Sequence, residues 1–590
     1  MNYLNKKEEQ NKKPLRNFVV CGLLLALMFI LSFSSARSEN QIIDESAHIV
    51  SGFSYWKTGI WHLNREHPPL IKLIATFPLL FTKAELNTNT ASWISGDQWN
   101  MGHDFLYNNK ISADTILLLT RIPMMLIALV LGWLIWMWSK KLFGFWGAVF
   151  SLTLYVLDPN ILAHSRYVTT DIGSALGFAL SLYCLWRYLQ TPTTRNLFFT
   201  GAAFGLAIVT KFSTVLLIPF FLIFSIIFII FYVPRRHKLD FTLRRTWQLL
   251  AATLGGALAF ITLTYALALP HISANLQLIS EFKEYSGITL PFYHIFLDGL
   301  FFVIGHSAGG HYSYLLGNFD IHGGWWYYFP IAFLIKTPPA TLIIFGLTIL
   351  LLITQWTKTF IHRLNTQPNS RAAKTRLLHR IPSIPFHYVI LIGTPAIYMI
   401  ASILNSINIG WRHLLPMYPF LFIAAGKLPT LAQRIPQTAG KTYRIWKYTW
   451  AATLSGFVLI LAVSSFTAYP GYLSYFSERI GGSTEGYKYL LDSNIDWGQD
   501  IKRLSNYIKK NNIKTVYLAE FGRAPAAYYG IHALPLPVEL TSLEAQQLNA
   551  VVAISVTRLI NEKNDYAWLK NFTPTDNIEH SILIYDFRKK

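Results

Sequence analysis

The sequence predicts a polytopic α-helical membrane protein with about 11 membrane-spanning helices and a small C-terminal α/β domain. Three observations predict this class. Of the 590 residues, 52% are hydrophobic and only 14% are charged, whereas soluble domains average about 25% charged residues. The apolar residues form runs close to the roughly 20 residues that span a bilayer. Most of the net charge of +21 lies between these runs; such a distribution orients a membrane protein and does not indicate a nucleic-acid partner.

The apolar runs give the positions of the helices in order. The first run follows a basic N-terminus and resembles a signal peptide, but we expect an uncleaved helix there. Cys21 and Cys184 lie inside apolar runs, where cysteine behaves as a small hydrophobic residue. The expected spans are 17–35, 115–138, 143–157, 171–189, 197–210, 212–233, 246–268, 328–355, 386–404, 413–427 and 448–468.

The loops between the runs predict the topology. With the N-terminus inside, each inward loop is basic, and the outward loop 36–114 has six Lys and Arg against eight Asp and Glu. An odd number of spans then places residues 469–590 outside. The inward basic residues are Lys140, Lys141, Arg187, Arg195, Arg235, Arg236, Lys238, Arg244, Arg245, Lys358, Arg363, Arg371, Lys374, Arg376, Arg380, Lys427, Arg434, Lys441, Arg444 and Lys447.

The last 122 residues differ in character from the rest. They carry 14 Lys and Arg against 13 Asp and Glu, and contain no cysteine. Short strands are expected at 516–520, 551–555 and 582–585, with an amphipathic helix at 497–511. We therefore divide the chain into a membrane module, residues 1–468, which includes a first outward loop at 36–114, and an outward α/β domain, residues 469–590.

The first outward loop contains the most suggestive carboxylates. Asp44 and Glu45 stand about ten residues beyond the first span, with His48 close by. Adjacent carboxylates near a membrane surface suit a general base or a metal ligand. They equally suit the N-terminus of a helix, where acidic residues are favoured.

A second motif follows in the same loop, at Glu66-His67-Pro68-Pro69. Two prolines can open a helix, and the stretch 70–81 is apolar but too short to span. It fits an interfacial helix whose Lys72 and Lys83 reach headgroups or a lipid phosphate; a re-entrant anchor is the alternative.

Further polar residues stand at the predicted outward ends of spans. Charges near a bilayer core are usually paired or functional, although each basic residue could be a snorkelling anchor. The topology places them on one face together with Asp44, Glu66 and His67. They are Asp158, Arg166, Asp171, Lys211, Lys336, Arg412 and His413.

The loop 270–327 carries His294, His306, His311 and His322, but their spacing matches no established metal-ligand pattern. Gly305-His-Ser-Ala-Gly309 has the form of a nucleophile elbow. That elbow needs a soluble strand-turn-helix context, which a membrane loop does not offer.

Taken together, the motifs resemble the bacterial branch of the dolichyl-phosphate-mannose protein mannosyltransferases. This family belongs to the GT-C class, with the lipid A aminoarabinose transferases. The resemblance spans nearly the whole chain and rests on six motifs: Asp44-Glu45, Glu66-His-Pro-Pro-Leu-Ile-Lys72, Asp158-Pro-Asn…Arg166-Tyr…Asp171, His322-Gly-Gly-Trp-Trp-Tyr-Tyr-Phe-Pro330…Lys336-Thr-Pro338, Trp411-Arg-His-Leu-Leu-Pro416 and Ser493-Asn-Ile-Asp-Trp-Gly-Gln-Asp500.

The resemblance implies a GT-C fold in a bacterial inner membrane and a sugar donor linked to polyprenyl phosphate. By that resemblance Asp44, with Glu45, would supply the catalytic carboxylate that deprotonates an acceptor hydroxyl, with inversion at the sugar. The donor phosphate would meet Lys72, Lys211, Lys336 and Arg412. Glu66, His67, Asp158, Arg166, Asp171 and His413 would position substrates. Members differ in metal use, so a divalent metal on Glu45 or Glu66 stays open.

His67 agrees with the mannosyltransferase branch, since the aminoarabinose branch has lysine there. The eukaryotic enzymes carry a β-trefoil module in a later loop, and no loop here has room for one, so protein mannosylation is not implied. The acceptor could be a surface glycan, lipid A or a protein. Two other classes of function remain: a transporter or flippase, which should place charges at mid-membrane on repeated halves, and a non-catalytic scaffold.

Overall fold

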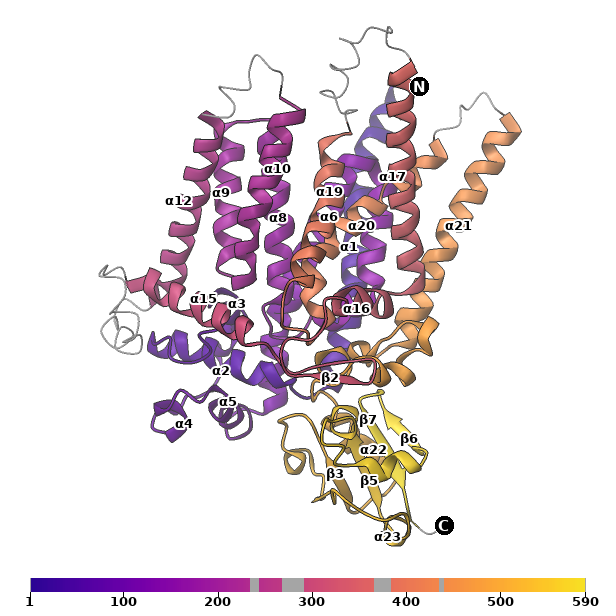
Figure 1. Ribbon diagram of the computed structural model, residues 1–590. Helices are drawn as coiled ribbons and strands as arrows, with labels where there is room; N and C mark the ends of the chain where they lie inside the picture. Colours follow the sequence, from indigo (N-terminus) through magenta and orange to yellow (C-terminus); the bar gives the residue numbers. More distant parts are fainter. Residues whose placement is uncertain (1, 234–243, 268–290, 366–383, 434–439, 589–590) are drawn as a thin grey trace.

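The computed structural model describes residues 2–233, 244–267, 291–365, 384–433 and 440–588. Figure 1 shows a bundle of long helices with short helices and the C-terminal sheet gathered at one end, which we call the domain end. The N-terminus lies at the opposite end. The long helices are α1 (Asn2–Ser38), α6 (Ala113–Leu157), α8 (Asp171–Gln190), α9 (Thr194–Ile208), α10 (Leu217–Phe231), α12 (Thr246–Tyr265), α17 (Pro339–Asn365), α19 (Phe386–Ile403) and α21 (Gly440–Thr467).

Within the described ranges, nine helices are long and apolar enough to cross a membrane. The expected number was about 11, and two features account for the difference. α6 consists of two helices joined at Gly144, whose φ of 74° and ψ of −168° suit only glycine. α9 packs on α8 and α12 but has only 15 residues. The predicted class, a polytopic helical membrane protein with a small C-terminal α/β domain, is confirmed.

The expected span at 328–355 is wrong at its start. α16 (Tyr328–Lys336) is a separate short helix at the domain end (Figure 1). Thr337 is extended, with φ −79° and ψ 131°, because it precedes Pro338. The spanning helix α17 begins only after this break.

Two spans form the centre of the bundle. They are α8 and the span Trp411–Ala432, which is built from η6 (Trp411–Met417), α20 (Tyr418–Ala425) and η7 (Leu428–Gln433). In their apolar windows 83% and 78% of the residues are buried, against 50% or less in the other candidate spans. α8 starts with Asp171, and the second span has Arg412 at its start. These two charges therefore begin the innermost spans of the described bundle.

The first loop folds into short helices at the domain end: α2 (Ile43–Thr58), α3 (Leu70–Thr76), η1 (Phe77–Phe81), α4 (Ala91–Ile94) and α5 (Gln98–Tyr107). The helical stretch predicted at 70–81 is present as α3 and η1. Ile74, Phe77 and Phe81 are exposed on it, as an interfacial helix requires. Lys83 is exposed as expected, but Lys72 is buried.

Other short helices connect the main elements: α7 (Pro159–His164), η2 (Phe212–Leu216), α15 (Pro291–Gly309), η9 (Tyr472–Ser474), η10 (Glu478–Ile480), η11 (Ser483–Lys488), η12 (Asp492–Asn494), η13 (Ala526–Tyr529) and η14 (Ala567–Asn571). β1 (Ser313–Leu315) and β2 (Asn318–Asp320) form an antiparallel hairpin. Part of the histidine-containing loop, 268–290, lies outside the described residues. So do the inward basic residues Arg235, Arg236, Lys238, Arg371, Lys374, Arg376, Arg380 and Arg434.

The C-terminal sheet is mixed, in the order β4-β3-β5-β7-β6. β3 pairs with β4 and β5 in parallel, whereas β7 pairs with β5 and β6 antiparallel. The predicted strands and the predicted helix are present. The elements are β3 (Val516–Ala519), β4 (Ala533–Pro535), β5 (Val551–Ser555), β6 (Asp576–Ile578), β7 (Ile582–Asp586), α22 (Ile501–Lys510), α23 (Ser542–Gln547) and α24 (Val556–Leu559).

A buried charge network joins the end of α1, the start of α2 and the membrane bundle. Glu45 receives two hydrogen bonds from the Arg121 guanidinium, at 2.8 and 2.6 Å. Glu39 is held by Arg166 in the same two-bond manner, and by Arg503 at 3.3 Å. All five side chains are buried. Charges removed from water are tolerated only when paired in this way, so the network fixes the path of the chain from α1 into α2.

The C-terminal domain is fastened to this same turn. The amide of Ile43 donates to the Trp497 carbonyl at 2.9 Å, and the amide of Asn40 donates to the Gln499 carbonyl at 3.2 Å. Lys502 forms an ion pair with Asp114 at 2.6 Å. The start of α2 is therefore positioned jointly by the bundle and by the domain.

We expect Arg121→Met to lower the free energy of unfolding by about 3–5 kcal/mol, because it leaves the Glu45 carboxylate buried without its cation. The measurement is thermal unfolding of the purified protein in detergent. Lys110→Met is the control, since its pair with Glu85 is exposed and should contribute below about 1 kcal/mol. Equal shifts in the two variants would contradict the structural role of the buried pair.

Candidate active site

Four charged side chains meet at the domain end of the two central spans. Arg412 lies between two carboxylates, with its Nη1 at 3.5 Å from an oxygen of Asp44 and 3.5 Å from an oxygen of Asp171. Lys211 donates to the other oxygen of Asp171 at 2.6 Å. Of the two carboxylates, Asp171 is buried, whereas the Asp44 side chain keeps 22% of its surface exposed. We call these four residues the central cluster.

Asp44 reaches this position because it stands in the first turn of α2, whose N-terminus is held by the C-terminal domain. Burial raises the pKa of its carboxyl to about 6. The Arg412 guanidinium opposes this rise. Three nearby carboxylates add to it, those of Asp492, Asp171 and Glu66. A carboxylate with such a pKa is a better proton acceptor than a free aspartate and is still largely ionised at neutral pH.

The guanidinium of Arg412 stacks on the ring of Trp497. Its guanidinium carbon lies 4.2 Å from the centre of the Trp497 ring, an arrangement that favours a cation. Its Nε is buried and has no hydrogen-bond partner among the described residues. Buried polar atoms are normally paired. This nitrogen is thus available to an oxygen of a bound ligand.

Histidines surround the central cluster and share this property. His48 stacks on His67 with ring centres 4.9 Å apart. Within the described part of the chain, His48 Nδ1, His164 Nδ1 and His413 Nε2 are buried without a hydrogen-bond partner. Burial lowers the pKa of His48 to about 3, so its ring is neutral. These rings can contribute hydrogen bonds to a ligand without adding charge.

Glu66 stands at the edge of the site and is held by two amides. Its Oε1 accepts hydrogen bonds from Asn64 at 2.9 Å and from Gln98 at 2.7 Å. The side chain is half-buried, and its negative charge contributes to the raised pKa of Asp44. This placement suits the predicted positioning role.

Of the four cations predicted to bind phosphate, two donate their hydrogen bonds to oxygen atoms of the protein. Lys72 Nζ contacts the Tyr55 hydroxyl, both oxygens of Asn64 and the His67 carbonyl, at 2.7–3.0 Å. An ammonium has only three N–H donors, so none is left for a ligand. Lys336 Nζ donates to the carbonyls of Leu473 and Asn494 at 2.9 and 2.6 Å. Both lysines are fully buried and fasten loops, whereas Lys211 and Arg412 remain in the site.

Three other predicted residues take part in the surrounding structure. The two carboxylate oxygens of Glu45 accept hydrogen bonds from Arg121, from the amide of Val168 at 3.1 Å and from the amide of Ile42 at 3.0 Å. Asp158 caps α7 through the amides of Asn160 and Ile161. Arg166 pairs with Glu39, as described above. The structure does not bring these residues into the central cluster.

No group of three or more His, Cys, Asp and Glu side chains in the described ranges is arranged to hold a metal ion. The oxygens of Glu45 are all engaged, so it is a poor ligand; Glu66 has one oxygen engaged. We derive no step through a metal.

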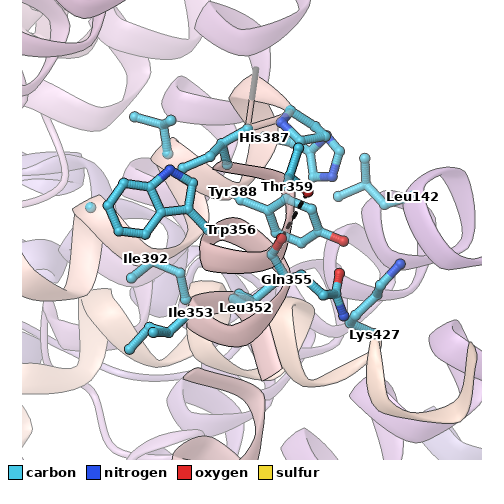
Figure 2. Close-up of a pocket in the computed structure, with 14 residues that line it drawn as sticks. Leu142, Leu352, Ile353, Gln355, Trp356, Thr359, His387, Tyr388, Ile392 and Lys427 are labelled. Atoms are coloured by element: carbon cyan, nitrogen blue, oxygen red, sulfur yellow. Dashed lines mark hydrogen bonds between the residues drawn. The ribbon is translucent and has the colours of Figure 1, made fainter. Parts of the chain in front are cut away.

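A cavity of about 690 Å³ lies between α17 and α19 at the end opposite the C-terminal domain (Figures 1 and 2). Figure 2 shows Trp356, Tyr388 and Ile392 in its wall, with His387 and Lys427 among the polar groups. None of the described residues that line it carries a carboxylate. The described side chains that combine a carboxylate with cations are those of the central cluster, which is therefore the better candidate for catalysis.

Several residues that build the site were not predicted to do so. Arg121 interrupts an apolar run, and a charge there is itself a signal of a buried partner. Asp492 contributes to the site only through folding of the tail, and no local pattern marks it. Trp497 belongs to a motif whose role was open.

The chain was compared with known proteins. A search of curated proteins gave no match. By structure it is similar to ArnT from Cupriavidus metallidurans bound to undecaprenyl phosphate, with 12% identity, a TM-score of 0.41, and coverage of 96% of this chain and 98% of that one. It is also similar to the oligosaccharyltransferase AglB from Archaeoglobus fulgidus in complex with an inhibitory peptide and a dolichol-phosphate, with 12% identity, a TM-score of 0.41, and coverage of 92% and 70%.

The protein O-mannosyltransferase Pmt1-Pmt2 of S. cerevisiae, bound to its sugar donor, matches with 15% identity, a TM-score of 0.32, and coverage of 43% of this chain and 34% of that one. Residues 111–266 match the family model of the dolichyl-phosphate-mannose-protein mannosyltransferases. The resemblance predicted from the motifs is thereby confirmed over these residues, which make up about a quarter of the chain.

Proposed function

We propose that this protein is an inverting glycosyltransferase that moves a sugar from a polyprenyl-phosphate donor to an acceptor hydroxyl. The observation that carries the proposal is the central cluster. It holds a half-buried carboxylate of raised pKa beside two cations that keep hydrogen-bonding capacity. A sugar phosphate needs both groups: a base for the acceptor and positive charge for the phosphate.

Asp44 is the proposed general base. The acceptor oxygen attacks the anomeric carbon from the face opposite the phosphate, and its proton passes to the Asp44 carboxylate. The bond between the anomeric carbon and the phosphate oxygen breaks, and the oxygen keeps the electron pair. The configuration of the sugar is inverted, and polyprenyl phosphate leaves with one more negative charge.

Arg412 and Lys211 stabilise that charge. Fixed cations act strongly in a site from which water is largely excluded. Asp171 is their counter-ion, and it holds both cations in place before the donor arrives. His413, whose Nε2 has no partner in the described structure, adds a neutral contact. Lys72 and Lys336 support the walls and do not touch the phosphate.

We propose that the domain end faces the outside of a bacterial inner membrane. The other end, where α8 and α17 finish and α9, α12 and α21 start (Figure 1), carries Arg187, Lys358, Arg195, Arg245 and Arg444. Such basic ends are typically cytoplasmic. The central cluster would then meet a lipid-linked donor in the outer leaflet.

A transporter is less well supported. Three charges of the central cluster, those of Asp171, Lys211 and Arg412, stand at the starts of spans, and Asp44 stands at the start of α2, at the same end of the bundle. A transport pathway instead calls for polar groups near the bilayer midplane.

We expect Asp44→Asn to lower the rate of sugar transfer by about 10²–10⁴-fold, because an amide cannot accept the acceptor proton. The measurement is transfer of radiolabelled sugar from a panel of polyprenyl-phosphate donors by the purified protein. The control is Asp104→Asn, an exposed aspartate of the same loop, which should transfer at the wild-type rate. Unchanged transfer by Asp44→Asn would remove Asp44 from the mechanism.

The raised pKa of Asp44 predicts the acidic limb of the pH profile. Ionised Asp44 is the active form, so kcat/KM, which reports the pKa of the free protein, is constant well above pH 6 and falls as the pH drops through about 6. At pH 5 the rate should be about tenfold below the plateau. An unfolding curve at each pH controls for loss of structure. A limb near pH 4 would mean that the carboxyl behaves as a free aspartate.

We expect Arg412→Met and Lys211→Met to weaken donor binding by roughly 10–100-fold, since each removes a charge-assisted hydrogen bond. Binding of undecaprenyl phosphate to the purified variants measures this directly, without turnover. Lys110→Met, which alters an exposed lysine of the first loop, is the control. Wild-type affinity in both cluster variants would show that the phosphate binds elsewhere.

A further inference from the structure

A second cavity, of about 400 Å³, lies at the domain end between the C-terminal domain and loops that border the active site. One wall is formed by the β1–β2 hairpin and by residues 408–409, just before η6. Another wall is formed by residues 557–566, which follow β5 in the C-terminal domain. Its volume falls within the ~300–1,000 Å³ of small-molecule sites.

Aromatic side chains dominate the lining. They come from both the membrane module and the C-terminal domain, so a ligand in the cavity contacts rings from both. A sugar ring presents flat C–H faces to such side chains, while its hydroxyls point outward. The six aromatic residues are Tyr312, Tyr314, Phe319, Tyr328, Phe521 and Tyr566.

One buried polar atom of the lining lacks a partner. Asn408 donates through its Nδ2 to the carbonyls of Gly323 and Trp325, at 3.0 and 3.1 Å. Its Oδ1 is buried and accepts no hydrogen bond from the described residues. An unpaired buried carbonyl oxygen is costly. A ligand hydroxyl entering the cavity would satisfy it.

The charges of the cavity argue against a phosphorylated ligand. The described lining includes three carboxylates, Asp492, Glu562 and Asp565, against the two cations Arg558 and Lys563. Arg558 already donates to the Glu520 carbonyl at 3.0 Å. Phosphate groups are bound where cations are in excess. This lining instead suits an uncharged, hydroxyl-rich molecule.

Asp492 connects the cavity to the proposed base. Asp492 lines the cavity, and its carboxylate acts electrostatically on both Asp44 and Arg412. Asn408 lies four residues before Arg412 on the same segment. A ligand held between the two walls could therefore present one hydroxyl toward Asp44.

We propose that this cavity binds the acceptor, and that the acceptor is the uncharged saccharide end of a glycan. This inference rests on the proposed function and selects among the three acceptor classes that the sequence left open. The aromatic walls stack on the sugar rings, Asn408 accepts a hydroxyl, and the acceptor hydroxyl next to Asp492 is the one deprotonated.

The first test is direct binding, without turnover. Purified full-length protein, labelled with a fluorophore, is applied to an array of neutral, acidic and phosphorylated glycans that also carries bis-phosphorylated lipid A and Ser/Thr-rich peptides. We expect binding to neutral glycans. Binding to lipid A or peptides alone, or to no glycan at all, overturns the inference.

The second test locates the binding in the cavity. Tyr566→Ala should weaken binding of the best neutral glycan, and raise its KM in transfer, by roughly three- to tenfold, with kcat and the donor KM unchanged. Tyr566→Phe, which keeps the ring, should bind like wild type. Tyr507→Ala alters a half-buried tyrosine of the same domain outside the cavity and is the matched control. Equal effects of Tyr566→Ala and Tyr507→Ala would place the glycan elsewhere.

Measuring donor consumption distinguishes failure of the proposed function from failure of the saccharide inference. If wild-type protein consumes no polyprenyl-phosphate sugar in the presence of any array ligand, the proposed function fails. If it consumes donor but transfers only to lipid A or to a peptide, the function stands and the saccharide inference fails.

Discussion

The buried ion pairs between acidic residues near the start of α2 and arginines of the bundle are the constraint on which the site depends. Glu45 with Arg121, and Glu39 with Arg166 and Arg503, lie away from water. Removing one partner leaves an uncompensated charge, so the turn between α1 and α2 has little freedom to move. Asp44 is adjacent to this turn. Its distance from Arg412 is consequently set by structure that takes no part in the chemistry.

The C-terminal domain completes this arrangement from the other side. The Trp497 carbonyl receives the amide that begins α2, and its ring lies under Arg412. One residue thus positions both the proposed base and a proposed phosphate-binding cation. Asp496 and Asp500 secure the same segment through Ser555 and Ser581. The tail is therefore part of the framework of the candidate site, and this positioning role requires no contact with the donor.

The sequence predicted the fold well because bilayer spans, basic loops and alternating strands are local patterns. It also predicted that Asp44, Asp171, Lys211 and Arg412 would share one face, since topology alone brings the ends of spans together. It could not distinguish these from Lys72 and Lys336. A lysine that binds phosphate and a lysine that binds buried carbonyls look alike in sequence, and the difference lies in distant partners such as Leu473 and Asn494. Pro338 indicates a helix break at Thr337. The prediction nevertheless continued the span across it, because the residues on both sides are strongly apolar.

Arg412 connects the two halves of the proposed reaction. In the structure its Nη1 is shared between Asp44 and Asp171, and its charge lowers the proton affinity of Asp44. A donor phosphate that binds Arg412 brings a negative charge close to the same carboxylate and weakens that influence. The pKa of Asp44 then rises further, which makes it a stronger base once the donor is in place. As the leaving phosphate gains charge, the carboxylate loses its own by accepting the proton, so the total charge beside Arg412 changes little. The shared cation therefore couples proton removal from the acceptor to departure of the lipid phosphate.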